Sequence, residues 1–401
     1  MGRCFEGETS LSRRNFLTAA GMTVLSMAGG QSMAYDSNSK INIAIIGCGK
    51  RGTWITEYFI NHGGYNIVAA CDYFQDKVDA YGEKFGVAAD KRFAGLSGYK
   101  KVVECKPDAV AILSPPYFHP EQAAAAIDAG INVYLAKPIA VDVPGCQSIS
   151  ESGKRATENR LCFLVDFQTR VQPFYQEAVK RVQYGDIGVI ASGEANYHTT
   201  RLGLMTMSGT AEGRLQNWVF DKVLSGDIII EQNIHAIDVV SWILDADPVY
   251  AMGSGGRKVR TDVGDCWDHF SVIFNYPDDV VISFNSKQFG EGCEELGCRM
   301  YGAEGTLFTE YGGKVNIMGN NPYKGGNTEG MYTSGVVENI KDFYNNITKA
   351  RFYNPTVAES VRCHLAGILG RMAAYKRDKI TYKQMIESNE KLIADLAGLK
   401  D

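Results

Sequence analysis

The chain has 401 residues, 45% of them hydrophobic and 22% charged, and it carries a formal net charge of −5 at pH 7. This slight acidity lacks the basic footprint of a nucleic-acid-binding protein, and no apolar run approaches the roughly 20 residues that span a bilayer. We therefore expect neither a nucleic-acid partner nor a transmembrane segment, and the length favours two domains.

The first 34 residues have the layout of an export signal. Arg13 and Arg14 precede Phe16 and an apolar run, which is followed by small residues ending at Ala34. A charged start, a short apolar stretch and a small-residue cleavage site are typical of a signal peptide, and the arginine pair resembles the twin-arginine type. We predict a signal peptide over residues 1–34 and a periplasmic or exported protein, or a cytoplasmic one if the signal is not used.

The cysteines give no sign of a metal site. Ten are present, but none forms a CxxC pair or a Cys/His cluster with zinc spacing. Cys293 and Cys298 are close enough in sequence to form a disulfide, which the sequence alone does not decide. We predict that the protein binds no metal.

A dinucleotide-binding turn follows a buried strand near the start of the folded chain. Residues 41–47 (INIAIIG) read as a strand buried on both faces, and a G-x-G-x-x-G pattern then opens a helix that runs to about residue 61. A second strand ends at Asp72, 20 residues beyond Gly52, the spacing expected for an acid that binds a ribose. This order of elements is much more specific than the glycine motif alone.

Each glycine of the motif has a physical task. One permits the tight turn, one lets the backbone approach a pyrophosphate at the helix N-terminus, and one permits close packing of helix on strand. Asp72 would repel a 2′-phosphate, which favours NAD over NADP, although Arg51 keeps NADP open. The predicted cofactor-binding residues in this stretch are Gly47, Gly49, Lys50, Arg51, Gly52 and Asp72.

Helical and strand patterns alternate from here to residue 167. This alternation predicts a parallel, doubly wound sheet, and we assign residues 41–170 to an NAD-binding Rossmann domain. Ligands of such sheets bind beyond the carboxyl ends of the strands, where Ser114, His119, Lys137 and Arg170 fall. We predict that Ser114 and His119 contact the cofactor and that Arg170 contacts the substrate, with a plain helix-start residue as the alternative for His119.

Four segments together resemble the Gfo/Idh/MocA family of pyridine-nucleotide-dependent sugar dehydrogenases and their relatives. They are IGCGKRG, AILSPPYFHPEQAAAAIDAGINVYLAKP, GDIGVIASGEANY and SGDIIIEQNIHAIDVVSWIL, in the family's order. The resemblance implies a Glu-Lys-Pro motif at residues 136–138, where Ala136 replaces the glutamate. It also implies an acid-x-x-x-His motif at Glu231 and His235, and it places Lys137 near the nicotinamide and the reacting hydroxyl.

The residue types in these motifs suit proton transfer at a secondary hydroxyl. A histidine, with an ordinary pKa of roughly 6.5, can act as a base near neutrality. On one helix Glu231 and His235 would share a face, so we expect the acid to hydrogen-bond to the ring and orient it. The predicted catalytic residues are Lys137, Glu231 and His235, with Lys137 also a cofactor contact. The alternative for His235 is a packed structural histidine.

From about residue 171 the pattern changes to a helix followed by longer alternating strands. It predicts an α+β domain over residues 171–401, with a largely antiparallel sheet, one helix-covered face and C-terminal helices. We interpret residues 320–330, which are rich in glycine, as a loop. The resemblance implies that this domain contacts substrate and forms an oligomer interface, so we expect a homo-oligomer. Candidate sugar contacts, chosen for aromatic or hydrogen-bonding side chains, are Arg170, Tyr197, His198, Arg201, Arg214, Asn217 and Trp218.

The resemblance implies hydride transfer from a sugar or glycoside hydroxyl to NAD. An exported protein has no NAD pool to draw on, so a tightly bound cofactor and a redox-neutral reaction would reconcile the signal peptide with the dinucleotide site. Three hypotheses stay open. They are an NAD-dependent oxidoreductase, an NAD-dependent glycosidase that works by oxidation, elimination, hydration and reduction, and a non-catalytic sugar-binding sensor.

Overall fold

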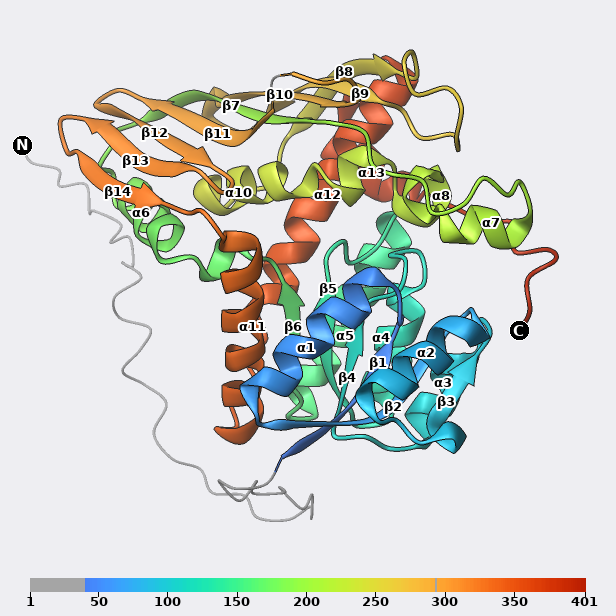
Figure 1. The fold of residues 1–401 in the computed structure, drawn as a ribbon. Coiled ribbons are helices and arrows are strands. Elements are labelled where there is room, and N and C mark those ends of the chain that lie inside the picture. The colour runs from blue at the N-terminus through green and yellow to red at the C-terminus, as the bar shows by residue number, and fades with distance from the viewer. Residues whose placement is uncertain (1–39, 293) are drawn as a thin grey trace, which may run out of the picture. The chain divides into compact units, whose positions relative to one another are not determined.

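The computed structural model describes residues 40–292 and 294–401, which belong to one compact unit. The predicted signal peptide (1–34) and Cys293, one partner of the possible disulfide, lie outside the described residues. Across the described ranges, no helix is both long and apolar enough to cross a bilayer. Two β-sheets dominate the molecule, one below and one above in the view of Figure 1.

The first sheet is parallel and doubly wound, as predicted. Its six strands lie in the order β3-β2-β1-β4-β5-β6. Most of them consist of apolar residues that are buried on both faces of the sheet. The strands are β1 (Ile41–Ile46), β2 (Tyr65–Asp72), β3 (Arg92–Ala94), β4 (Ala109–Ile112), β5 (Asn132–Ala136) and β6 (Phe163–Asp166). The helices between them are α1 (Lys50–His62), α2 (Gln75–Phe85), α3 (Gly98–Glu104), α4 (His119–Asp128) and α5 (Val143–Glu158).

The second sheet has nine strands in the order β14-β13-β12-β11-β7-β10-β9-β8-β15. Every neighbouring pair is antiparallel except β7 and β10, which confirms the prediction of a largely antiparallel sheet. The strands are β7 (Ile190–Thr199), β8 (Tyr250–Gly256), β9 (His269–Asn275), β10 (Val281–Gln288), β11 (Glu295–Gly302), β12 (Gly305–Glu310), β13 (Lys314–Gly319), β14 (Tyr323–Asn327) and β15 (Ile380–Thr381).

One prediction for this half is wrong. The stretch 320–330 is not simply a loop, because it contains the edge strand β14, which pairs with β13. Its glycines disguised the strand, since glycine is depleted from strands, and Gly325 has a φ of +55° that other residues rarely adopt. The strand is tolerated at an edge, where only one side of its backbone must pair.

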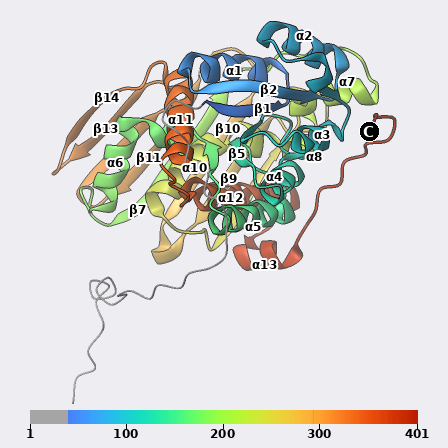
Figure 2. The same ribbon diagram turned by 90° about the horizontal axis from the view of Figure 1, so that it is seen from below.

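Helices cover one face of the second sheet, and two of them return to the first. The helices are α6 (Pro173–Gln183), α7 (Ala211–Gln216), α8 (Lys222–Ser225), α9 (Ile228–Glu231), α10 (Ile234–Leu244), α11 (Met331–Thr348), α12 (Pro355–Lys376) and α13 (Tyr382–Ser388). α11 packs along α1, and α12 packs against β8 on one side and against α5 and β6 on the other (Figures 1 and 2).

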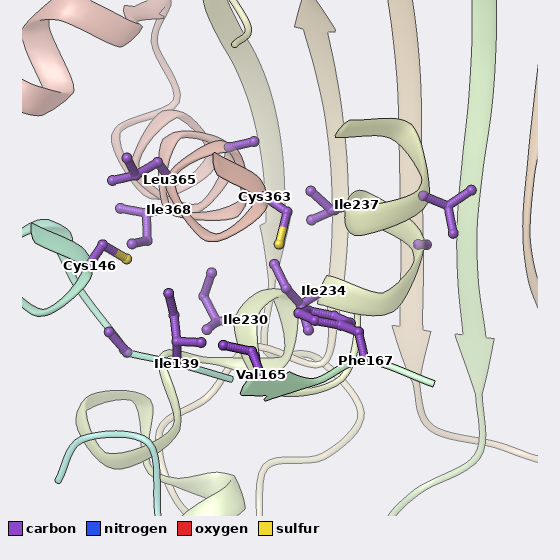
Figure 3. Packing of buried hydrophobic residues seen from close by; sticks show 14 of the residues in the cluster. Ile139, Cys146, Val165, Phe167, Ile230, Ile234, Ile237, Cys363, Leu365 and Ile368 are labelled. Carbon is purple, nitrogen blue, oxygen red and sulfur yellow. The ribbon is translucent and has the colours of Figure 1, made fainter. Parts of the chain in front are cut away.

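The core between the two sheets is continuous. Val165 of β6 and Phe167, which directly follows this strand, meet Ile230 of α9 and Ile234 of α10, with α12 packed over them (Figure 3). His364 of α12, expected to be structural, lies in this core, where its Nε2 accepts a hydrogen bond from the Ile139 backbone N–H at 3.1 Å. This shared core fixes the carboxyl ends of β5 and β6 relative to α9 and α10.

Candidate active site

A cleft of about 610 Å³ lies where the strand ends of the first sheet face β7, α7 and α9. It adjoins the point between the parallel strands β1 and β4 where the order of strands in the sheet reverses, the place where doubly wound sheets bind ligands. Residues from both sheets line it. The predicted site residues among them are Gly47, Gly49, Lys50, Arg51, Gly52, Asp72, Ser114, Lys137, Tyr197, Trp218, Glu231 and His235.

The glycine turn at the start of α1 is shaped for a pyrophosphate. Gly47 has a φ of +99°, and a Cβ there would lie 2.7 Å from the Leu113 carbonyl carbon, so only glycine fits the turn. A Cβ on Gly52 would lie 1.9 Å from the Gly47 oxygen, so this glycine lets the helix pack closely on the strand. A Cβ on Gly49 would meet nothing within 4 Å, which leaves the approach to the helix N-terminus open.

Asp72 closes the same turn from the end of β2. Its carboxylate accepts hydrogen bonds from the backbone N–H groups of Cys48 at 2.8 Å and Phe74 at 3.0 Å. Burial raises the pKa of Asp72, and these backbone donors oppose that rise. The acid is thus held rigidly at the cleft wall, in the position that the sequence predicted for a ribose contact.

The Arg51 side chain does not lie beside Asp72. Its guanidinium donates to Asp166 at the end of β6 and to the Tyr332 hydroxyl of α11 at 2.8 Å. β6 is the edge strand on the far side of β1 from β2, so the side chain turns away from the ribose end of the cleft. The position of Arg51 therefore gives no support to a contact with the 2′-phosphate of NADP.

Lys137 lies at the other end of the cleft, directly after β5. Its Nζ donates to the Glu231 backbone oxygen at 2.6 Å and lies 3.9 Å from the Glu231 carboxylate. Burial lowers the pKa of Lys137, while the carboxylates of Glu231 and Asp166 oppose that change. An ammonium group with a lowered pKa gives up its proton more readily than a surface lysine.

The expected bond between Glu231 and His235 is wrong. The chain is not one helix here, because α9 ends at Glu231 and α10 begins at Ile234, so the i, i+4 geometry does not apply. In the part of the chain that the structure describes, no hydrogen bond joins the two side chains, and Glu231 turns to Lys137 instead. The acid supports the lysine rather than the histidine.

His235 is held by packing. Its ring lies edge-on to the Phe167 ring, with 6.0 Å between the ring centroids, and tilted against the Tyr311 ring, with 5.1 Å between the centroids. Its Nδ1 is buried without a hydrogen-bond partner. Burial, together with the positive charges of Lys137 and Arg51, lowers the pKa of His235 well below its ordinary value. The ring is therefore neutral at physiological pH and can accept a proton.

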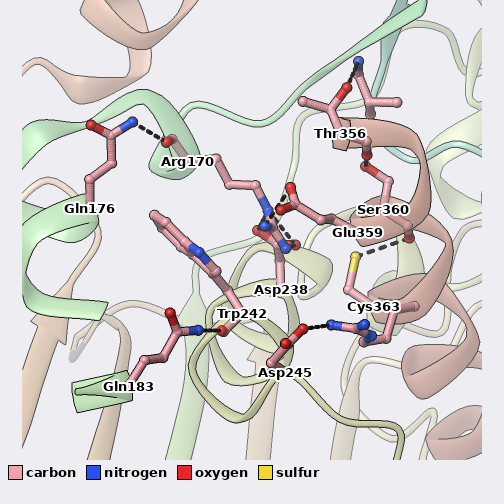
Figure 4. Close-up of polar contacts among 12 residues, drawn as sticks. Arg170, Gln176, Gln183, Asp238, Trp242, Asp245, Thr356, Glu359, Ser360 and Cys363 are labelled. Carbon is pink, nitrogen blue, oxygen red and sulfur yellow. Dashed lines mark hydrogen bonds and ion pairs between the residues drawn. The ribbon is translucent and has the colours of Figure 1, made fainter. Parts of the chain in front are cut away.

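Arg170 is a structural residue, contrary to prediction. Its guanidinium makes a two-pronged contact with the Asp238 carboxylate, with Nη2 at 2.8 Å and Nε at 3.0 Å, and also pairs with Glu359 at 2.7 Å (Figure 4). Asp238 is completely buried and Arg170 nearly so. The pair joins the end of the first sheet to α10 and α12, and the guanidinium does not line the cleft.

Three further predicted contacts also lie off the cleft. Buried His119 contacts the carbonyls of Ser114 and Pro138, each at 2.7 Å, and burial lowers its pKa to about 4, so it braces the cofactor loop from behind. His198 alternates with Tyr197 along β7 and points to the opposite face of the sheet. Arg214 pairs with Asp221 and donates to the Asp395 carbonyl at 2.7 Å.

Two weaker candidates also have structural partners. Arg201 forms an exposed ion pair with Asp262, with a nitrogen–oxygen distance of 2.7 Å. The Asn217 amide bonds to the backbones of Met205 and Thr206, both at 2.8 Å, and so holds the loop that covers this part of the cleft. Trp218 and Tyr197 remain as aromatic side chains that line it.

Sequence reasoning missed several residues at the catalytic end. Asp166 is fully buried, accepts a hydrogen bond from Asn339 at 2.7 Å, and pairs in register with Ala136 on the neighbouring strand. An acid therefore stands beside the position where the family glutamate is missing. Its place at the end of a buried strand was a usable signal. Gln168, Gln232 and Tyr332, unlike Asp166, line the cleft, and no sequence pattern singled them out.

Solved structures share this two-sheet fold. The myo-inositol 2-dehydrogenase of Lactobacillus plantarum superposes with a TM-score of 0.68 at 20% identity, over 86% of this chain and 99% of that one. GenD2 from gentamicin A biosynthesis, solved in complex with NAD, gives a TM-score of 0.70 at 16% identity, over 89% of this chain and 99% of that one. The molecule therefore has the same two-sheet architecture as these solved structures.

Curated relatives are more similar in sequence but match over shorter stretches. The D-glucoside 3-dehydrogenase of Escherichia coli K12 is 26% identical over 229 residues, 56% of this chain and 60% of that protein. The scyllo-inositol 2-dehydrogenase (NAD(+)) of Bacillus subtilis 168 is 22% identical over 273 residues, 67% of this chain and 73% of that protein. The match thus spans less than two thirds of the first of these relatives.

Two protein-family models match the chain. Residues 41–166 match the oxidoreductase family with an NAD-binding Rossmann fold, and residues 175–308 match the GFO/IDH/MocA C-terminal domain. The protein belongs to the Gfo/Idh/MocA family of oxidoreductases, as its four sequence segments predicted.

Proposed function

We propose that the protein oxidises a secondary hydroxyl of a sugar, polyol or glycoside, with NAD as the hydride acceptor. The observation that carries this proposal is the convergence of Lys137, Glu231 and His235 at one end of the cleft whose other end holds the glycine turn and Asp72. Relatives named as glucoside and inositol dehydrogenases support the substrate class. They give no support to a glycosidase or a sensor.

The side chains divide the proton chemistry between them. NAD, when bound, supplies the acceptor for the hydride. His235 is neutral and packed in place, so it can take the hydroxyl proton as that hydride leaves. Lys137, held at its Nζ by Glu231, places a positive charge where the hydroxyl oxygen becomes negative. Gln168, Gln232 and Tyr197 line the same end and offer hydrogen bonds to neighbouring hydroxyls.

The decisive experiment starts with a cofactor count. The protein is purified without added nucleotide and denatured, and the released NAD and NADP are quantified by mass spectrometry. We expect near-stoichiometric NAD that becomes reduced when single sugars, polyols and methyl glycosides are added. A protein that neither contains nor binds NAD(H), and forms no NADH with any member of the panel, contradicts the proposal.

Asp72 should determine the choice of NAD over NADP. We expect Asp72→Ser to weaken NADH binding by about tenfold or more, because a hydrogen bond to a charged group contributes roughly 1.5–3 kcal/mol. The same change removes the charge that repels a 2′-phosphate, so NADPH should bind more tightly. Titration of nucleotide fluorescence measures both affinities. The control is Asp76→Ser. Asp76 lies in the first turn of α2 and does not line the cleft, so this change should leave the preference for NADH over NADPH unchanged.

A further inference from the structure

The last residues of the chain run along the nucleotide end of the cleft. After α13 ends at Ser388, residues 389–401 form no helix or strand and pass beside α7 to the loops that follow β2 and β3 (Figures 1 and 2). We call this segment the C-terminal clasp. None of its residues lines the cleft itself, but it contacts residues of both cleft walls.

The clasp is tied to the wall that belongs to the first sheet. The Lys400 backbone N–H donates to the Tyr73 hydroxyl at 3.0 Å, and the Lys400 carbonyl accepts from the Leu96 N–H at 3.1 Å. Both Tyr73 and Leu96 line the cleft. At neighbouring Gly95, a Cβ would lie 2.3 Å from the Asp401 oxygen, so the clasp fits closely against this loop.

The clasp is also tied to the opposite wall. Arg214 of α7 donates to the Asp395 carbonyl at 2.7 Å. Ala394 is buried in one apolar cluster with Leu215, which lines the cleft, and Leu396 and Leu399 pack against this cluster. Tyr73 and Phe74 of the first wall pack against the same cluster, so the apolar contacts of the clasp bridge the two walls.

We propose that the C-terminal clasp closes the nucleotide end of the cofactor cleft and slows the release of the dinucleotide. The walls cannot separate there unless the clasp first detaches from Tyr73 and Leu96 or from α7. It contains no helix or strand and lies outside the main apolar core, so it can open locally while the core stays folded. This proposal rests on the proposed function, since it assigns to the clasp the retention of the dinucleotide that the cleft would bind.

The test measures how fast NADH leaves the full-length protein. The protein is loaded with NADH, mixed with excess NAD, and followed by the loss of bound NADH fluorescence. In Leu396→Ala/Leu399→Ala the clasp loses its apolar contacts, and we expect release about tenfold faster, a difference of about 1.4 kcal/mol in barrier. A chain that ends at Ser388 should show at least this acceleration.

A matched control lies within the same segment. Ile393 is 76% exposed and is not part of the apolar cluster, so Ile393→Ala shortens an apolar clasp residue but leaves the cluster intact, and it should release NADH at the wild-type rate. Equal release from the double variant and the wild type overturns the clasp, even if the truncated chain fails to fold. A wild-type protein that binds no NADH overturns the proposed function instead.

Discussion

Replacing His235 by alanine should lower kcat by about 10²–10⁴-fold, the contribution typical of a positioned general base. The affinity for NADH should stay nearly unchanged, because the glycine turn and Asp72 lie at the other end of the cleft. Steady-state kinetics on the sugar that reduces bound NAD, together with NADH titration, separates the two effects. Full activity in His235→Ala would refute the catalytic assignment.

The control is a second histidine with the opposite placement. His198 also belongs to the sugar-contact candidates of the sequence, but it faces away from the cleft on β7, so His198→Ala should retain wild-type kinetics. The pH profile adds a signature that packing alone would not produce. Because the pKa of His235 is lowered, the ring stays neutral as the pH falls through 6.5, and the acid-side loss of kcat/KM should occur below that pH.

Asp238→Asn should produce the largest loss of stability that we predict. It leaves the buried Arg170 guanidinium without its main counter-charge, and breaking one partner of a buried ion pair costs about 3–5 kcal/mol. We expect the free energy of unfolding to decrease by about 3 kcal/mol, because Glu359 still neutralises part of the charge. Denaturant titration followed by fluorescence measures it.

An exposed ion pair provides the comparison. Asp262→Asn breaks the pair with Arg201 at the surface, where solvent screens the interaction, and should leave the unfolding midpoint nearly unchanged. If Arg170 served substrate binding instead of structure, Asp238→Asn would raise KM and leave the unfolding midpoint in place. That outcome would contradict the structural assignment of this pair.

The features that could be predicted from the sequence are those that neighbouring residues in the chain determine. The glycine turn, the strand-end positions of Ser114 and Lys137, and the parallel sheet follow from local patterns that no distant residue overrides. The pairing of Glu231 with His235 was wrong because the spacing argument requires an unbroken helix. Its break at residues 232–233 depends on tertiary packing, and Asp227, before α9, has a φ of +73° that no pattern reveals.

Charged residues were harder to assign because their partners are remote. Arg170 reads as a ligand contact until Asp238 is placed against it, 68 residues further along the chain. Arg51 reads as a phosphate contact until Asp166 and Tyr332 draw it to the other end of the cleft. The role of each arginine depends on which acidic residue the fold places beside it. The spacing of residues along the sequence does not reveal that partner.

The return of α11 and α12 to the first sheet sets an order of events during synthesis. The last strand of that sheet is complete at Asp166, but α12, which covers α5 and β6, ends at Lys376. At roughly 5–20 residues per second, a ribosome needs roughly 10–40 s to add the intervening residues. During that interval the apolar faces of α1, α5 and β6 are uncovered in the nascent chain. For that period these faces can be covered only by contacts other than those of the finished fold.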